Sequence, residues 1–544
     1  MKRIVPQFLL GLLMPAFSAA VMAQSYNMDI NMRDGSVTTI PADQVTDVTF
    51  STASELPDDA GIILAEVSGV GGYILSVKPI GNATAYRWMK DGETVQESTA
   101  LSFFTTTSGR FSVAGVNDFG EGKPSPEIQV NPITTVFNIL TEEFIPDARL
   151  RAHIDEEYAG NTGELTNLQA AAIPGGFYLP REIESLKGIE YFTGIDSLLT
   201  FVSNSYVKEI DLSKNVNLKK IDLQDYFNLA SLNLEGLNLL ESLDISWTSL
   251  KQFDVSLLPE GMKHLGLGHL EYTSFDCQRF PDLEELIIYD NKFSGDFDAS
   301  GLKKLRKLQL SSCSQLLSVD VTDCTSLKDL NVSYCSALSS LDVSTCLALT
   351  KLYAQYTSLA DVDLSAQYDQ LKVFNPQGSP FKSLDLKGMR QLEVCQAGDC
   401  ALETIPDFSD CVMLKNLRME HCLAKEPVNV DKCLNMEDLN IYEANITGIA
   451  LKDMPALWNV NMFSNYEQKT LQLENLPALQ YLSCYDLPLI ERVDISTVNH
   501  KADISFNMCP ALKEIKVWPE FDINNPPSNV SKDETAKFVY EFSE

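Results

Sequence analysis

The sequence is poor in histidine and, beyond its first residues, has no long apolar run. It contains five His, and no H-E-x-x-H motif, G-x-S-x-G nucleophile elbow or phosphate-binding glycine loop is present. There is no tight C-x-x-C pair, so a zinc site is not expected. After residue 23 no segment has 18 uninterrupted apolar residues, so no transmembrane segment is expected. We therefore predict a protein that is not an enzyme and needs no metal or other cofactor.

Basic residues are scarce beside acidic ones. The chain has 42 Lys and Arg against 75 Asp and Glu, and its formal net charge is −33 at pH 7. Such a charge repels the phosphate backbone of nucleic acids and anionic membrane surfaces. No nucleic-acid partner is expected. The charge is explained equally well if the acidic residues simply keep a long leucine-rich protein soluble.

A repeat of 21 or 22 residues occupies more than half of the 544 residues. Residues 283–293 read L-E-E-L-I-I-Y-D-N-K-F, close to the pattern L-x-x-L-x-L-x-x-N-x-L. Apolar positions 1, 4 and 6 predict a short strand with one buried face, and stacked coils would form a parallel sheet over a leucine core. About 14 coils would span roughly 65 Å. The coils begin at Leu218, Leu240, Met262, Leu283, Leu305, Leu327, Leu349, Leu371, Leu392, Leu414, Met436, Leu457, Leu479 and about Lys501.

A second L-x-x-L-x-L pattern lies between the main frames, for example at residues 316–321 and 338–343. Each coil is therefore expected to have an extended segment on both faces, with little room for a helix on the back. Asp320, Asp342, Asp363 and Asp385 occupy the same place in successive back segments. Aspartates at such places form turns by accepting a backbone N–H, and a bound cation is the alternative.

The frame resembles the leucine-rich repeats of bacterial cell-surface proteins, in the variant with 21–22 residues per repeat. This resemblance covers residues 183–520 and implies a solenoid that binds another macromolecule. The family often has Asn at position 9, and two coils of this sequence have it too, with Asn291 and Asn465. Elsewhere this sequence has other small residues at that position, namely Cys313, Cys335, Cys400, Cys422, Cys509, Thr248 and Thr357.

All 12 cysteines lie inside the predicted solenoid. Equivalent cysteines one coil apart would have Cα atoms about 5 Å apart, which is within disulfide range. Stacked side chains point in parallel, however, whereas a disulfide needs converging Cβ atoms. A ladder of free, buried thiols is therefore favoured over disulfides. The regular spacing of 11 is seen in Cys313, Cys324, Cys335 and Cys346, and again in Cys400, Cys411, Cys422 and Cys433.

The N-terminal residues predict export. Residues 1–23 have a basic start, an apolar core too short to span a bilayer and small residues before Gln24, as in a secretory signal peptide. Residues 24–57 predict a short β segment, with strands at 26–32 and 45–50 and a turn pair at Asp34-Gly35.

Residues 58–132 predict a β-sandwich, because short alternating runs are separated by Gly, Asn and Asp. Residues 86–92, Y-R-W-M-K-D-G, followed by residues 109–117, G-R-F-S-V-A-G-V-N, resemble an immunoglobulin-like domain. The resemblance implies that Trp88 is the core tryptophan and that the domain is a spacer. The usual cysteine pair is absent, and Phe111 stands where a tyrosine is common.

Residues 133–200 are expected to form the N-terminal cap and the first irregular coil. Two short helices are predicted around residues 160–165, and this arrangement resembles the EF-hand-like cap of bacterial surface repeat proteins. The loop lacks carboxylates at the ligand positions, so no calcium is expected. Residues 201–520 would be the solenoid proper and residues 521–544 a C-terminal tail.

Aromatic residues in the later coils indicate a binding surface. Three of them fall at position 7, which faces outward on the concave side, in consecutive coils, and exposed rings beside amides suit a protein or sugar partner. The alternative is that the rings only stack along the sheet for stability. The candidate residues are Tyr442, Phe463 and Tyr485 at position 7, Tyr481 at position 3, and Asn440 and Asn461 at position 5.

These observations predict a mainly β, exported binding protein located at the cell surface, in the periplasm or outside the cell. A protein partner, in adhesion or at the envelope, is favoured. A surface glycan is one alternative, and a structural envelope role without a discrete ligand is another. The sequence does not indicate an oligomeric state.

Overall fold

The computed structural model describes residues 27–31, 37–41, 56–68, 72–105, 107–131 and 136–543. The chain divides into two units, residues 1–56 and 57–544. In the first unit β1 (Asn27–Asn31) pairs antiparallel with β2 (Val37–Pro41). β2 thus begins two residues after the predicted turn pair Asp34-Gly35. The segment 45–50, expected to be that strand, and the signal-peptide residues 1–23 lie outside the described residues.

Residues 56–131 form two antiparallel sheets that share one core. Trp88 and Phe111 are fully buried in it, and the Trp88 ring stacks on Phe103 with 5.8 Å between ring centroids. The immunoglobulin-like assignment stays a prediction. One sheet contains β3 (Leu64–Ser68), β4 (Gly72–Ser76) and β7 (Ser102–Thr105). The other contains β10 (Ile128–Val130), β8 (Gly109–Asn117), β5 (Ala85–Lys90) and β6 (Glu93–Ser98), with β9 (Gly120–Glu121) paired to β8.

Two short helices precede the repeats. The Asp147 carboxylate caps α1 (Ala148–Tyr158) by accepting the first free backbone N–H groups, and Thr166 forms a capping box at α2 (Asn167–Ala171). In the loop between them, the N–H of Gly163 donates to the Asp155 carboxylate at 2.9 Å. The buried face of α1 joins the same hydrophobic core as the first coils.

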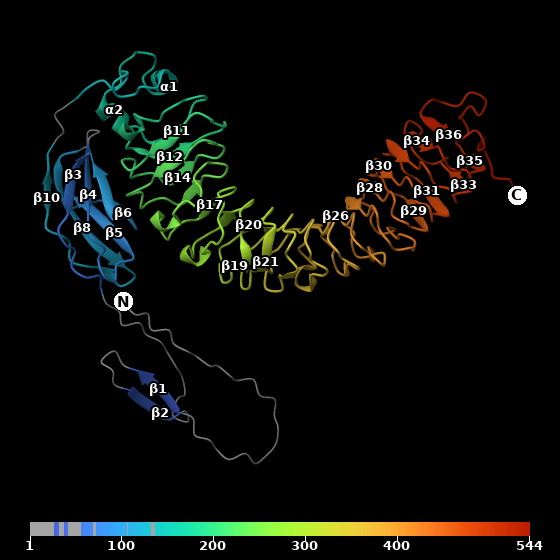
Figure 1. Ribbon diagram of the computed structural model, residues 1–544, viewed down its shortest axis with the longest axis horizontal. Coiled ribbons are helices and arrows are strands. Elements are labelled where there is room, and N and C mark those ends of the chain that lie inside the picture. Colours follow the sequence, from blue (N-terminus) through green and yellow to red (C-terminus); the bar gives the residue numbers. More distant parts are fainter. Residues whose placement is uncertain are drawn as a thin grey trace. The chain divides into compact units, whose positions relative to one another are not determined.

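A single parallel sheet of 17 strands runs through the repeats and follows a curved arc, with the sheet on its concave side (Figure 1). Fourteen of its strands begin two residues after the start of a predicted frame. They are β14 (Lys220–Asp222), β16 (Ser242–Asp244), β17 (His264–Gly266), β18 (Glu285–Ile287), β20 (Lys307–Gln309), β22 (Asp329–Asn331), β24 (Lys351–Tyr353), β25 (Val373–Asn375), β26 (Val394–Gln396), β27 (Asn416–Arg418), β28 (Asp438–Asn440), β30 (Asn459–Asn461), β32 (Tyr481–Ser483) and β34 (Asp503–Phe506).

Three further strands extend the sheet, so the expected count of about 14 coils is too low. β11 (Gly175–Tyr178) and β12 (Ile195–Leu199) precede the frames, and β36 (Val530–Lys532) follows them. Backbone pairing needs only a strand in register, so an irregular segment can continue the sheet at either end. The sheet therefore reaches beyond residues 201–520 at both ends.

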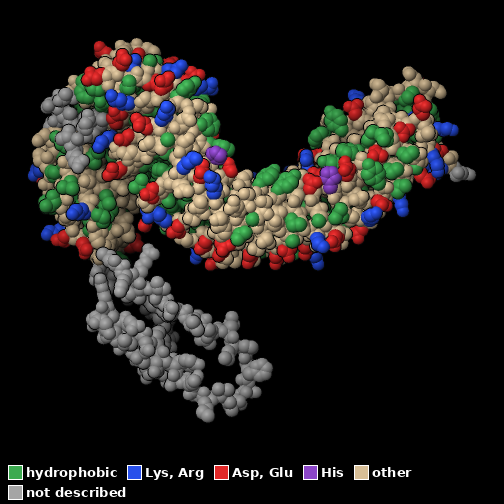
Figure 2. All heavy atoms as spheres, viewed as in Figure 1, with side chains coloured by type: hydrophobic (Ala, Val, Ile, Leu, Met, Phe, Trp, Pro, Cys, Tyr) green, Lys and Arg blue, Asp and Glu red, His purple; other side chains and the backbone are tan. Residues whose placement is uncertain are grey.

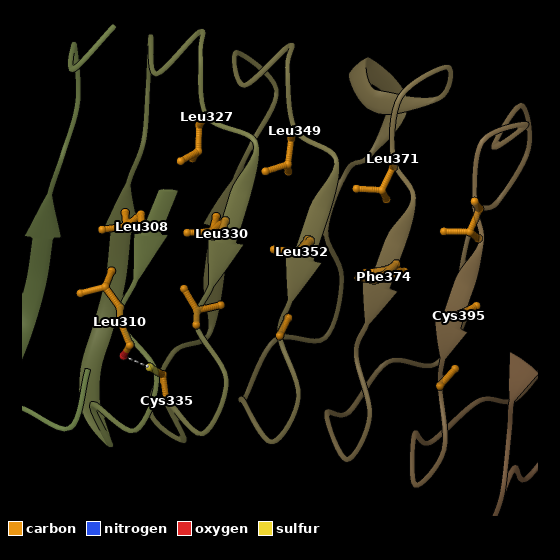
Figure 3. Packing of buried hydrophobic residues seen from close by; sticks show 14 of the residues in the cluster. Leu308, Leu310, Leu327, Leu330, Cys335, Leu349, Leu352, Leu371, Phe374 and Cys395 are labelled. Carbon is orange, nitrogen blue, oxygen red and sulfur yellow. Dashed lines mark hydrogen bonds between the residues drawn. The ribbon is translucent and has the colours of Figure 1, made fainter. Parts of the chain in front are cut away.

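The leucine frame forms the core between the two faces. Leu308, Leu330 and Leu352 are paired in register on neighbouring strands and fully buried, and the position-1 leucines lie beside them (Figure 3). Burying one such side chain contributes about 1.5–3 kcal/mol. Since a coil can bury this edge only against its neighbours, the stacking itself is what stabilises each coil.

The back face has short parallel strands in several coils, and the helices in the coils are single turns. These strands form four small sheets, which agrees with the second apolar pattern. The strands are β13 (Glu209–Asp211) with β15 (Ser231–Asn233); β19 (Ser294–Asp298), β21 (Gln315–Asp320) and β23 (Ser340–Asp342); β29 (Gly448–Lys452) with β31 (Thr470–Glu474); and β33 (Arg492–Asp494), β35 (Glu514–Lys516) and β37 (Lys537–Val539). Single turns of 3₁₀ helix occur at Val255–Leu257, Cys277–Arg279 and Ser365–Gln367, and one more precedes the frames at Ile189–Tyr191.

A left-handed residue ends the concave strand of every one of the 14 frames. It stands at position 8, with φ between 51° and 67°. This conformation turns the chain sharply and leaves the side chain at the edge of the concave face. The residues are Asp225, Trp247, His269, Asp290, Ser312, Tyr334, Tyr356, Gly378, Asp399, His421, Glu443, Ser464, Asp486 and Met508.

Position 9 turns back into the core, and where the residue is Asn, Cys, Thr or Ser its side chain donates to backbone carbonyls. Asn291 Nδ2 donates to the carbonyl of Leu267, at position 6 of the preceding coil, at 3.0 Å. Cys335 Sγ donates to the equivalent carbonyl, that of Leu310, at 3.1 Å. Asn and Cys are thus both small donors that satisfy the equivalent buried acceptor, which explains how cysteine can stand where other coils of this chain have asparagine.

Candidate functional site

The predicted aromatic residues lie on the neighbouring strands β28, β30 and β32 of the concave sheet. The rings of Tyr442 and Phe463 are half-buried and stacked, with 4.5 Å between centroids and 9° between planes. Two further rings are more open: Tyr481 is 50% exposed and meets Trp458 edge-on, and Tyr485 is 39% exposed. The structure therefore brings the predicted rings onto one surface.

The stack is shorter than the expected column of three rings. It joins Tyr442 to Phe463, whereas the hydroxyl of Tyr485 lies against Sδ of Met508 in the next coil. Among the residues that the structure describes, no ring contact links Phe463 to Tyr485. The surface thus consists of a stacked pair with two separate rings beside it.

The two predicted asparagines differ in what they offer a ligand. Asn440 is 8% exposed, and its amide nitrogen donates to the Asp438 carboxylate at 2.9 Å. The same carboxylate also accepts from Asn416 at 3.0 Å and Asn459 at 2.6 Å. Oδ1 of Asn461, in contrast, has no hydrogen-bond partner among the described residues. That oxygen is buried, however, so Asn461 can accept a donor from a ligand only if its side chain turns toward the surface.

A carboxylate cluster of Asp399, Glu420 and Glu443 lies directly beside the stacked rings. His421 joins its members, with Nδ1 hydrogen-bonded to Asp399 and Nε2 3.4 Å from Glu443. The His421 ring also meets Tyr442 edge-on at 5.6 Å. The hydrogen bond to Asp399 raises the pKa of His421. Figure 2 shows acidic side chains gathered around a histidine on this part of the concave side.

Glu420 is the buried member of the carboxylate cluster, at 3% exposure. Its carboxyl group lies over Gly398, where a Cβ atom would come within 2.2 Å of Cδ. Oε1 is 3.5 Å from the amide nitrogen of Gln377, and Oε2 has no hydrogen-bond partner among the described residues. Burial raises the pKa of this carboxyl group. An acceptor buried in this way costs stability unless something supplies a donor.

A second stacked pair of rings lies on the other side of the carboxylate cluster. Tyr334 and Tyr356 are 51% and 40% exposed, with 5.1 Å between centroids and 19° between planes. Gly378 leaves room for the Tyr356 ring, because a Cβ there would lie 2.4 Å from it. Reading only positions 3, 5 and 7 of each coil as outward missed this pair together with Asp399, His421 and Glu443, whereas Glu420 stands at position 7 itself. Their signal in the sequence is position 8, together with the glycines at 378 and 398.

His264 and His269 each lie beside a carboxylate of the next coil. His269 stacks on Trp247 at 4.1 Å and pairs with Asp290 at 2.6 Å, while His264 lies 3.7 Å from Glu285. Within the described part of the chain, no three His, Cys, Asp or Glu residues are grouped as metal ligands. A groove of about 450 Å³ runs over β14 to β18 and is lined by side chains of both charges.

The aspartates of the back segments form turns. In each the carboxylate accepts the backbone N–H of the residue two positions on, for example Asp342 from Ser344 at 2.9 Å. Equivalent bonds are made by Asp298, Asp320, Asp363, Asp385 and Asp407. These bonds lower the pKa of Asp342, Asp363 and Asp407. The turn-forming interpretation is therefore confirmed.

All 12 cysteines are buried and unpaired, so the thiol-ladder prediction is confirmed. Burial raises the pKa of the Cys335 thiol to about 12 and that of Cys313 to about 11. Such thiols are poor nucleophiles and have a structural role. Among the described helices, none has the length and apolar character needed to cross a membrane.

No protein-family model matches the sequence, and no curated protein matches it. Several solved structures are similar in fold. The functional domain of InlJ from Listeria monocytogenes, described as including a cysteine ladder, is 20% identical with a TM-score of 0.49, covering 72% of this chain and 84% of that one. The internalin InlF of the same organism is 16% identical (TM-score 0.43; 62% and 98% covered). A leucine-rich repeat protein of Leptospira interrogans is 16% identical (TM-score 0.36; 58% and 94% covered).

Proposed function

We propose that this chain is an exported, non-enzymatic protein that binds another protein through the C-terminal half of its concave sheet. The observation that carries the proposal is the group of rings at Tyr442, Phe463, Tyr481 and Tyr485, which stay open on neighbouring strands. Aromatic side chains at the centre of an interface commonly supply most of its binding energy. Asn461 would add a hydrogen-bond acceptor beside them once its buried Oδ1 turns toward the ligand.

The rings add little to the solenoid core. Beneath them the position-4 and position-6 side chains Leu439, Ile441, Val460 and Met462 are already fully buried. Leaving apolar ring surface in water forgoes about 25 cal/mol for each Å². A purely stabilising role would favour rings that bury one another, whereas Tyr481 and Tyr485 remain 50% and 39% exposed.

A surface glycan is the second candidate ligand. Rings beside amide groups suit sugars, and Asn461 stands two residues before Phe463 in the same coil, although its unpartnered Oδ1 would have to turn out of its buried position. The protein partner is favoured because the surface continues past the rings into charged groups, which sugars without charge do not require.

The test replaces Tyr442, Phe463 and Tyr485 by Ala in the full chain. Retention of proteins from host and envelope extracts and binding to a glycan array are compared with the wild type. The matched control removes exposed rings from the first coils instead, Tyr178→Ala with Phe201→Ala, which stack at 5.4 Å. We expect the triple variant, and not the control, to lose a specific protein with its melting temperature almost unchanged. A large fall in melting temperature with binding retained would favour a stacking role alone.

Export and surface position form a separate part of the proposal. Residues 1–23 would be the signal peptide, 24–57 a short β segment, 58–132 an immunoglobulin-like spacer, 133–200 a cap with the first coil, 201–520 the solenoid and 521–544 a tail. Intact cells treated with added protease should lose the full-length chain if it is at the surface. Protection in intact cells, together with cleavage after the outer membrane is opened, would indicate the periplasm.

A further inference from the structure

We infer that the carboxylate cluster of Asp399, Glu420 and Glu443 binds a cationic Arg or Lys side chain carried by an extended segment of the partner protein. The inference rests on the proposed function and adds the chemistry of the partner to it. It also moves the centre of the surface toward the N-terminus, from the rings of β28 to β32 onto the coils of β26 and β27.

The buried carboxyl group of Glu420 is the main evidence. It is 3% exposed, and its Oε2 has no hydrogen-bond partner among the described residues. The group nearest Oε1 is the Gln377 amide, which lies 3.5 Å from Glu420 and 3.4 Å from Asp399. Both distances are at the limit of a hydrogen bond. A guanidinium or ammonium group that displaced this amide would make charge-assisted bonds of about 2.7–2.9 Å instead.

Stacked rings on both sides make the cluster suitable for a cationic side chain rather than for a metal ion. Tyr334 and Tyr356 precede it, and Tyr442 and Phe463 follow it. Ring faces attract Arg and Lys side chains, and carboxylates bind the same groups. From the coil of Tyr356 to the coil of Tyr442 there are four inter-strand steps, roughly 19 Å at the usual spacing. An extended segment of about six residues would span that distance.

Charge favours the same partner. The chain carries a net charge of −33, which attracts basic segments over long range. Within the site, His421 and Arg418 offset part of the cluster, and burial raises the pKa of Glu420 above its ordinary value. As pH rises, His421 loses its proton and Glu420 becomes fully ionised. Both changes make the surface more negative, so binding of a cation should strengthen with pH.

The experiment measures fluorescence anisotropy of a labelled octapeptide that alternates Arg and Tyr, titrated with the full-length protein. Its matched probe has citrulline in place of every Arg, which keeps the shape and removes the charge. We expect the Arg peptide to bind, with an affinity that falls as the salt concentration rises. The citrulline peptide should bind with at least about tenfold lower affinity. Affinity for the Arg peptide should also rise between acidic and mildly alkaline pH.

Variants then locate the binding. Glu420→Gln keeps the side-chain shape and should weaken the Arg peptide about tenfold, and Asp399→Asn should act in the same direction. The control Glu285→Gln removes one carboxylate from the same concave sheet, six strands away on β18, and should leave the affinity within about twofold. Circular dichroism checks that each variant is folded. If Glu420→Gln is not folded, the affinities of Asp399→Asn and Glu443→Gln decide whether the carboxylate cluster binds the Arg peptide.

Three results would overturn the inference: no binding of the Arg peptide, equal binding of the citrulline peptide, or equal losses in Glu420→Gln and Glu285→Gln. The proposed function would survive any of them if the triple ring variant still loses a protein partner. It would fail separately if that variant keeps the partner. If the wild type bound a glycan, the triple variant lost that binding and no basic peptide bound, both the cationic segment and the protein partner would be overturned.

Discussion

The thiol of Cys335 donates to the carbonyl oxygen of Leu310, one coil earlier, at a distance of 3.1 Å (Figure 3). The same kind of bond joins Cys400 to Pro376 at 3.2 Å and Cys509 to Cys484 at 3.2 Å. In each case a small donor at position 9 bonds to a carbonyl at position 6 of the preceding coil. The cysteines therefore contribute to the stacking of coils as hydrogen-bond donors.

Replacing Cys335 by Ala should destabilise the protein by about 1–3 kcal/mol, because the carbonyl of Leu310 loses its donor and a small cavity remains. Cys335→Ser should cost less, since Ser379 at the same position donates its hydroxyl to the carbonyl of Ala354, at position 6 of the preceding coil, at 2.8 Å. Urea unfolding of the two variants measures the difference. Equal losses would show that packing, and not the hydrogen bond, is what matters at this position.

The folded protein should resist thiol reagents. Burial raises the pKa of Cys335, Cys400 and Cys433 to about 12, so little thiolate is present near pH 8. Titration with Ellman's reagent should detect almost no reactive thiol in the native protein and 12 after denaturation. Fewer than 12 in denaturant without reductant would mean that some cysteines form disulfides.

Replacing Gly398 by Ala should weaken binding of the basic peptide about as much as Glu420→Gln does. The added Cβ would fall 2.2–2.6 Å from the Glu420 carboxyl atoms and push that group out of place. The side chain can move, so the melting temperature should change little. Gly261→Ala is the matched control, since no atom lies within 4 Å of its Cβ position. Unchanged peptide affinity in Gly398→Ala would argue against the buried position of Glu420 as the binding site.

The contribution of His421 to stability should depend on pH. Its hydrogen bond to Asp399 raises its pKa in the folded state, so the protonated form is bound more favourably there than in the unfolded chain. That contribution is complete below about pH 6.5, the ordinary value for histidine, and is lost as pH rises through the raised pKa.

The melting temperatures of wild type and His421→Asn should therefore differ most in mildly acidic solution and converge above neutral pH. Differential scanning calorimetry across this range gives the comparison. His500→Asn serves as the control, because the His500 ring stacks on Trp518 at 4.0 Å and lies outside the carboxylate cluster. A constant difference at every pH would mean that His421 acts through packing alone.

Much of the solenoid could be predicted from the leucine frame. Every frame start from Leu218 to Leu479 is followed two residues later by a strand, and the position-4 side chains lie in register. Of the three extra strands, β12 lies in the first irregular coil expected within residues 133–200, whereas β11 and β36 could not be predicted, because they pair by backbone geometry without the apolar pattern. The Asp turns and the unpaired thiols were predictable, since each depends on a local hydrogen bond or on parallel stacking.

The candidate site could be predicted only in part. Position 7 identified Tyr442 and Phe463, but a frame cannot tell that the Tyr485 ring meets Met508 instead of continuing the stack. Asn440 also looked available from its position, whereas its amide nitrogen is held by Asp438. Side-chain partners of this kind depend on rotamers, which a repeat pattern does not contain.

The amino-acid sequence alone determined which side of each coil is buried, because apolar residues, mostly leucine, recur at positions 1, 4 and 6 with a period of 21 or 22 residues and can be kept from water only on that side. Only the tertiary structure decided what meets at the concave edge. The left-handed turn at position 8 sets His421 between Asp399 and Glu443, and the missing side chain at Gly398 lets Glu420 lie over the neighbouring coil. These residues are about one repeat apart in sequence, and they come into contact only because stacked strands lie about 4.8 Å from one another.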